Sequence, residues 1–263
     1  MTETSLTGHT PLAGSPAGAA SAGTGAPRAP RAPRRRSWVR WLSVLLIVAG
    51  VLAVLDAGVT LVWQEPLSAL YAKLQQQRLS SALSTIERAQ PTLVERERLA
   101  RLPSERTRIA FLARELERRA GDGSPVGRIR IPHIGANFVV VNGTSPSDLK
   151  SGPGVYSRAS FPQARFPGVP GTTAIAAHRT TYLAPFRHID ALRRGDRIVL
   201  EMPYARFTYT VQRHRVVSPS NVHAAVGAAG YSRLVLSACT PLFSAAQRLL
   251  VFARLTRTVA LRT

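Results

Sequence analysis

The sequence is poor in several features that would otherwise narrow its function. One cysteine is present among 263 residues, so no intramolecular disulfide can form and the lone thiol is a candidate reactive group. There are 14 acidic against 35 basic residues, which gives a formal net charge of +21. Carboxylates this sparse hardly supply a calcium site, and no other metal-ligand cluster is visible. We therefore expect neither a metal nor a cofactor.

The positive charge is compatible with three classes of partner. These are nucleic acid, the anionic face of a membrane, and an anionic polymer such as a cell wall. Charge alone does not choose among them, so the compartment has to be decided by other features of the chain.

One long apolar run indicates the compartment. Residues 1–37 are rich in Ala, Gly, Pro, Ser and Thr, and we expect a disordered tail that ends in a cluster of arginines. Trp41 to Trp63 is then almost entirely apolar over 63 − 41 + 1 = 23 residues. A helix of that length crosses a hydrocarbon core of about 30 Å. We predict an uncleaved transmembrane signal-anchor over 38–64, with a cleaved signal peptide as the alternative.

The arginines before this run predict its orientation. By the positive-inside rule they place the N-terminus in the cytoplasm. Asp56 lies toward the outer end of the run, where a carboxylate costs less than at the centre. No later run is long enough to span again, so we expect the remaining chain outside the cell, which argues against a nucleic-acid partner.

Residues 66–120, within the segment 65–124, show a helical pattern with two interruptions. Pro91 breaks it once, and Thr92 with Glu95 fits a capping box for a new start. Pro103 followed by Ser104 marks a third start. Because the prolines break any sustained heptad, we predict a solvated, broken helical stalk and linker rather than a coiled coil.

The pattern changes to short β-type runs from Val126 onward. The predicted strands are 128–132, 137–141, 172–177, 197–201, 206–212, 232–238 and 249–255. Seven or eight short strands predict a mainly-β domain over 125–263, built as a closed or partly closed antiparallel barrel.

Two side chains at strand ends suggest nucleophilic chemistry. Cys239 ends the run 232–238, and Arg248 opens the run 249–255, so antiparallel pairing would bring them side by side. The guanidinium could stabilise the thiolate or the oxyanion that forms when the thiolate attacks a carbonyl. The alternative is an inert buried thiol.

His178 favours the catalytic interpretation. It follows the small-residue run 172–177, and a cysteine nucleophile needs such a partner to manage protons. His9 lies in the tail, and we interpret the remaining histidines as surface residues. These are His133, His188, His214 and His223. Asp190 and Asp196 look like ordinary turn residues.

The segments around these residues resemble sortases. GTTAIAAHRTTYLAPF (171–186) resembles the histidine motif of that family, and VLSACTPLFSAAQRLLVFA (235–253) resembles its TLxTC motif with the downstream arginine. GRIRIPHIG (127–135) and LKSGPGVY (149–156) are similar to the family as well. The HRTTYxAPF form is similar to class E sortases of high-GC Gram-positive bacteria. Ala238 and Ala177 stand where the family usually has Thr and Gly.

The resemblance implies an eight-stranded sortase β-barrel and transpeptidation at an LPxTG- or LAxTG-like sorting signal. Cys239 would attack the carbonyl between Thr and Gly, with His178 as acid/base and Arg248 as oxyanion stabiliser. The implied partners are surface proteins bearing a sorting signal, a peptidoglycan-precursor amine as acceptor, and the lipid bilayer. The absence of a class C lid motif favours anchoring of single proteins over pilin polymerisation.

Three other classes of protein share some of these features. The Ser-His-Gly-Cys signature of L,D-transpeptidases is missing, and papain-like or NlpC-type peptidases place Cys before His, the reverse of the order here. A non-enzymatic, membrane-tethered β-domain that binds anionic cell-wall polymer would explain the charge equally well. Only the combination of His178, Cys239 and Arg248 favours an enzyme over this non-enzymatic domain.

Overall fold

The structure is a computed structural model that describes residues 35–62, 66–89, 91–158, 161–222, 227 and 229–261. Most of the predicted tail, together with Trp63 and His223, lies outside these residues. Helix α1 (Arg35–Val62) contains the 22-residue segment Trp38–Val59, whose mean hydropathy of 2.5 and length suffice to cross a membrane. This agrees in length and composition with the predicted anchor.

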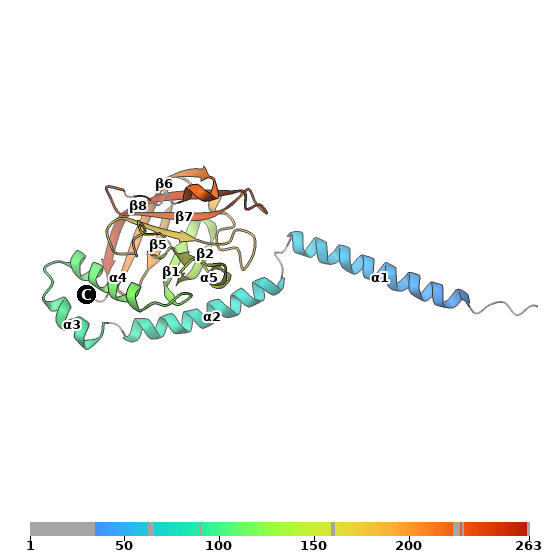
Figure 1. The fold of residues 1–263 in the computed structure, drawn as a ribbon, viewed down its shortest axis with the longest axis horizontal. Helices are drawn as coiled ribbons and strands as arrows, with labels where there is room; N and C mark the ends of the chain where they lie inside the picture. The colour runs from blue at the N-terminus through green and yellow to red at the C-terminus, as the bar shows by residue number, and fades with distance from the viewer. Residues whose placement is uncertain are drawn as a thin grey trace, which may run out of the picture. The chain divides into compact units, whose positions relative to one another are not determined.

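The described part of the C-terminal half forms a closed barrel of eight strands (Figure 1), with neighbours in the order β1-β2-β3-β4-β7-β8-β6-β5. The strands are β1 (Pro125–Ile131), β2 (Ala136–Asn142), β3 (Gly154–Val155), β4 (Thr172–Ala176), β5 (Arg197–Glu201), β6 (Ala205–Val217), β7 (Arg233–Thr240) and β8 (Gln247–Ala260). A short helix, α5 (Pro146–Ser151), lies between β2 and β3. The predicted mainly-β class and eight-stranded barrel are confirmed.

The barrel differs from the expected antiparallel one at two strand pairs. β2 pairs with β3, and β4 with β7, in parallel. Because β5 and β6 intervene in the chain between β4 and β7, the connection is long enough to return the chain to the same end of the barrel. Parallel pairing places the ends of β4 and β7 at one edge, where the candidate site lies.

β3 was not among the predicted strands. It has only two residues, and its position depends on close backbone approach. A Cβ at Gly154 would lie 2.0 Å from the carbonyl oxygen of Gly143, so a residue with a side chain would force the two backbones apart. Such a requirement leaves no hydrophobic pattern for a sequence analysis to detect.

Apolar side chains pack both inside the barrel and on part of its outer surface. Its interior is filled by a large apolar cluster that includes Ile175, Leu236 and Val251. A second group, here called the outer cluster, lies on the outside of β4, β7 and β8. It consists of Ala164, Ala174, Val217, Val222, Val235, Leu250 and Phe252, with Tyr156 and Phe161 packed against it. Alternate residues of these strands therefore serve opposite faces.

The helices before the barrel begin where the sequence predicts. They are α2 (Pro66–Ala89), α3 (Leu93–Ala100) and α4 (Glu105–Arg119). Thr92 and Glu95 form the predicted capping box of α3, and Ser104 caps α4. The prolines thus separate three helices, as expected from their effect on helix geometry.

These helices are not the expected solvated stalk, because they pack on the barrel (Figure 1). Leu112 and Leu116 of α4 are 2% and 3% exposed and belong to the interior cluster of the barrel. Gln76 of α2 accepts a hydrogen bond from the backbone N–H of Val139 (2.7 Å) and donates one to its carbonyl (3.1 Å). The side-chain amide thus pairs with β2 as a neighbouring peptide group would.

Candidate active site

The register of three adjacent strands brings the predicted residues to one edge of the barrel. Cys239 and Arg248 are directly paired on antiparallel β7 and β8, which implies a Cα separation of about 4.5–5.5 Å. On the other side of β7, Ala176 pairs with Ser237, and the N–H of Ala177 donates to the carbonyl of Ser237 (3.2 Å). His178 therefore continues β4 beside Cys239.

Strand alternation places the three side chains on the same face. Ala177, Ala238 and Leu249 belong to the interior cluster. Their neighbours His178, Cys239 and Arg248 consequently face outward, next to the outer cluster, and each is partly exposed. A thiol, an imidazole and a guanidinium thus meet on an accessible surface above an apolar floor.

The same alternation determines where the two residues that depart from the sortase-like motifs lie. Ala238 and Ala177 are 3% and 5% exposed and pack inside the barrel. Their side chains therefore face away from the thiol, and the small methyl groups fill the end of the interior rather than the candidate site.

The environment of His178 favours the neutral imidazole. Burial lowers the pKa of His178, and the positive charge of Lys150 lowers it further. The ring of Tyr182 lies 5.2 Å from the imidazole, between centroids. Because a neutral imidazole can accept a proton, this setting suits a group that deprotonates a thiol or an incoming amine.

A buried arginine links the loop after His178 to the end of β7. Arg179 is 4% exposed and forms an ion pair with Asp190 (2.6 Å). It also donates to the hydroxyl of Thr240 (3.1 Å), the residue after Cys239. Burial alone would raise the pKa of Asp190, but the hydrogen bond and charge of Arg179 outweigh it and hold that pKa below its ordinary value. Asp190 is therefore not an ordinary turn residue, contrary to the sequence interpretation.

The loop after His178 is conformationally strained. Tyr182, Leu183 and Ala184 have φ values of 51°, 63° and 41°, in the left-handed region that residues other than glycine rarely adopt. Arg187 then stacks over the exposed ring of Phe243 from the β7–β8 loop, 5.3 Å from its centroid. Strain of this kind persists where surrounding contacts impose it, and it is common at functional sites.

Tyr156 is a further residue of the site that the sequence reasoning did not single out. Val155 faces the interior, so Tyr156 faces outward, and its N–H donates to the carbonyl of Ala174 on β4 (3.0 Å). Because the outward residues at this end of β4, Ala174 and Ala176, are small, the ring can reach β7, where its hydroxyl hydrogen-bonds with Ser237. Burial raises the pKa of Tyr156, and the phenol also interacts electrostatically with Arg248 and Cys239.

Asp196 is a turn residue and the other three described histidines are surface residues, as predicted. Asp196 accepts a hydrogen bond from the N–H of Arg193 (2.6 Å) in a turn. His133, His188 and His214 are exposed. Among the described residues, none of these lies at the edge where β4, β7 and β8 meet.

Comparison with known proteins agrees with this geometry. A family model described as the sortase domain matches residues 129–256, which contain the end of β1, all of β2 to β7, most of β8 and all three candidate residues. The chain belongs to the sortase family.

Curated sortases are similar over part of the chain. Sortase D of Bacillus subtilis is 29% identical over 119 residues, which cover 45% of this chain and 56% of the relative. Sortase SrtE1 of Streptomyces coelicolor is 29% identical over 143 residues, 51% of this chain and 41% of the relative. The chain thus spans about half the length of the curated sortases it matches.

Solved sortase structures match about half of the chain. Sortase E from Streptomyces avermitilis is 31% identical, with a TM-score of 0.46, and the match covers 53% of this chain and 93% of that one. The SrtF sortase from Corynebacterium diphtheriae is 24% identical, with a TM-score of 0.49, over 54% and 90% of the two chains.

Proposed function

We propose that this sortase is a membrane-anchored cysteine transpeptidase that cleaves an LPxTG- or LAxTG-like sorting signal between Thr and Gly. The observation that carries the proposal is the pairing of Cys239 with Arg248 while His178 ends the adjacent strand on the same outer face. Membership of a family of cysteine transpeptidases, and the sequence likeness to sortases D and E1, support it.

In the first half-reaction the Cys239 thiol loses its proton to His178, and the thiolate attacks the threonine carbonyl carbon. The carbonyl oxygen becomes negative and accepts hydrogen bonds from Arg248. When the C–N bond to glycine breaks, the imidazolium returns its proton to the departing amine. The products are a peptide with a free glycine N-terminus and a thioester on Cys239.

In the second half-reaction an amine replaces the thiol. A cell-wall precursor amine attacks the thioester carbonyl, and His178 accepts the proton that the nitrogen releases as the new amide forms. Arg248 stabilises the second oxyanion, and collapse expels the Cys239 sulfur, which recovers a proton from His178. Net bond change is one amide exchanged for another, so no cofactor is consumed.

Two neighbouring residues, Arg179 and Tyr156, position this machinery in our account. Arg179, by bonding Asp190 and Thr240, fixes the loop of His178 against the end of β7. Tyr156 holds Ser237 beneath Cys239 and supplies a phenol near the thiol and Arg248. Both act by holding groups of the catalytic trio in place.

A defined peptide substrate tests the proposal. The full chain in detergent is incubated with a peptide containing LAETG or LPETG and with triglycine as the acceptor amine. We expect scission after threonine and a new Thr–Gly ligation product, both absent for Cys239→Ala. Turnover that survives in Cys239→Ala, or no scission of any such peptide, would remove the assignment.

We also propose that α1 anchors the chain with its N-terminus in the cytoplasm and the barrel outside. The arginines before α1 support this orientation. Since Cys239 is the sole cysteine, a membrane-impermeant methanethiosulfonate should label the protein on intact cells. Labelling seen only after lysis would reverse the topology.

A further inference from the structure

A hollow of about 790 Å³ opens at the other end of β4 and β7 from the candidate active site. Thr172 and Ser232 line it at the starts of these strands, whereas His178 and Cys239 lie at their ends. From Thr172 to His178 there are 178 − 172 = 6 residue steps, or about 20 Å at the rise of a strand. The hollow is therefore separate from the candidate active site.

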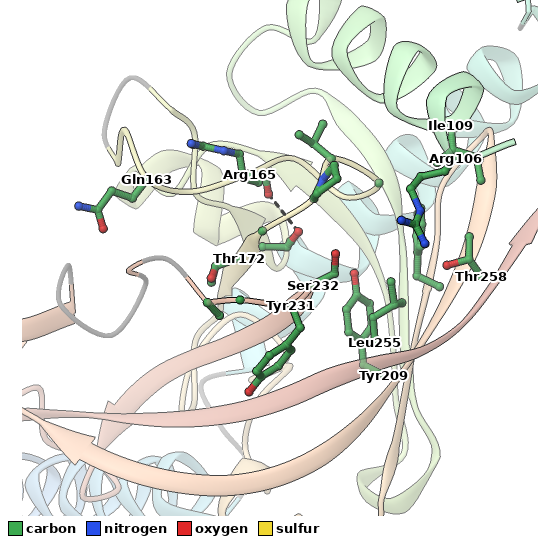
Figure 2. A pocket seen from close by; sticks show the side chains of 18 of the residues that line it. Arg106, Ile109, Gln163, Arg165, Thr172, Tyr209, Tyr231, Ser232, Leu255 and Thr258 are labelled. Atoms are coloured by element: carbon green, nitrogen blue, oxygen red, sulfur yellow. Dashed lines mark hydrogen bonds between the residues drawn. The ribbon is translucent and has the colours of Figure 1, made fainter. Parts of the chain in front are cut away.

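The inner wall of the hollow is apolar and belongs to the barrel interior. Phe207 and Tyr209 of β6 and Leu255 of β8 line it together with Ile109 of α4. Arg106 and Ile109, from the start of α4, lie on one side of the hollow (Figure 2). The mouths of barrels are common ligand sites, and the volume falls within the range of about 300–1,000 Å³ typical of them.

The buried hydroxyls of the inner wall already have partners. Thr172 donates to the carbonyl of Gly227 (3.0 Å), and Thr173 donates to that of Arg165 (3.0 Å). The hydroxyl of Tyr209 is hydrogen-bonded to Thr173. A ligand that enters the hollow therefore needs no polar groups at its inner end, and an apolar body fits best.

The rim carries the charge. Arg106 and Arg165 stand on opposite sides of the opening in Figure 2, against one acidic lining residue, Glu105. Within the described ranges Arg106 has no ion pair or hydrogen bond, and Arg165 donates Nη1 to the carbonyls of Pro162 (2.8 Å) and Ala164 (2.9 Å). Glu117 interacts electrostatically with Arg165, but Glu117 is not one of the residues that line the hollow.

We propose that this hollow is a binding site for a small amphipathic anion. Its apolar or aromatic body would lie against Phe207, Tyr209 and Leu255. Its carboxylate or phosphate would accept hydrogen bonds from Arg106 and Arg165, whose guanidinium groups suit such oxygens. This site is independent of the transpeptidase chemistry and lies on an end of the barrel that the proposed reaction does not use.

A photoreactive pair of probes tests both halves of the proposal. 4-Benzoylbenzoate combines two aromatic rings with a carboxylate, and 4-methylbenzophenone keeps the rings without the charge. Each is irradiated with the full chain in detergent, and the adducts are located by peptide mass spectrometry. Because the readout is the position of the adduct, it does not depend on peptide cleavage by the enzyme.

We expect 4-benzoylbenzoate adducts on peptides that line the hollow, such as those with Tyr209 or Tyr231, and few from the neutral probe. Arg106→Gln should raise the half-saturating concentration about tenfold, as the loss of a charge-assisted hydrogen bond predicts. Arg118→Gln is the matched control, since Arg118 is an exposed arginine of the same helix that does not line the hollow.

Two outcomes would overturn the proposal. One is a pattern of adducts confined to α1 or spread over the chain without enrichment at the hollow. The other is saturation that is unchanged in Arg106→Gln and in the double variant with Arg165→Gln. Melting curves of the variants show whether each is folded, and Arg106→Gln should melt like the parent because Arg106 is exposed.

Discussion

Replacing Arg248 by lysine separates an oxyanion donor from a surface charge. The side chain is partly exposed, and its Nη1 donates to the carbonyls of Ala245 (2.9 Å) and Gln247 (3.1 Å) in its own loop. In the described structure this leaves Nη2 and Nε without a hydrogen bond, available to a substrate over Cys239. Lysine has one ammonium group and cannot hold the loop carbonyls and an oxyanion in the same geometry.

The magnitudes of the two effects differ. Loss of one oxyanion donor typically costs about 10²–10³ in kcat, or roughly 3–4 kcal/mol of transition-state stabilisation. Loss of the loop hydrogen bonds costs only about 0.5–1.5 kcal/mol each, and less here because they are exposed to water. Arg248→Lys should therefore lose most of its kcat with a small change in Tm.

The assay is kcat/KM on a short LAxTG or LPxTG peptide, with melting curves on the same preparations. Arg257→Lys is the matched control, because Arg257 is an exposed arginine near the other end of β8. If Arg248→Lys stays within a factor of about three of the parent, the oxyanion role of Arg248 is wrong.

Three more predictions follow from the packing and charges. Leu112→Ala should lower the free energy of unfolding by about 2–5 kcal/mol, because Leu112 is buried between α4 and the barrel. Leu93→Ala, at a 76% exposed position, should leave it nearly unchanged. Equal melting temperatures of the two variants would support the solvated stalk that the sequence predicts. Lys150→Gln removes a positive charge that lowers the pKa of His178, so the pKa of His178 should rise, although burial still depresses it. The acidic limb of the kcat/KM profile should therefore move to higher pH. An unmoved limb would exclude His178 as the titrating base. Tyr156→Phe should cut kcat/KM by about tenfold and leave KM and the fold nearly intact, as expected for one lost neutral hydrogen bond beside Cys239. An unchanged kcat/KM would mean that Tyr156 has a purely structural role.

The parts of the fold that depend on local sequence were predictable. The prolines and the Thr92–Glu95 capping box gave the helix starts, and alternating β-branched runs gave seven of the strands. Direct pairing of Cys239 with Arg248 followed from one strand ending and the next beginning across a short loop. In each case a few neighbouring residues contain the information.

The parts that depend on distant contacts were not predictable. The spacing of Ile109, Leu112 and Leu116 indicated an apolar face on α4, but nothing in that spacing says that the barrel covers it. The Arg179–Asp190 pair and the reach of Tyr156 over β4 both arise from tertiary geometry. The stretch 149–156 already resembled sortases, and its single tyrosine was the available signal for Tyr156.

The central claim is that Cys239 forms a thioester with the threonine of a sorting signal. Intact-mass spectrometry of the full chain, quenched in acid soon after mixing with an LAETG peptide and no acceptor amine, tests it directly. We predict one added mass equal to the acyl fragment through threonine, removed by hydroxylamine and absent in Cys239→Ala. Scission of the peptide with no such adduct on the parent protein, or an adduct that persists in Cys239→Ala, would contradict the account.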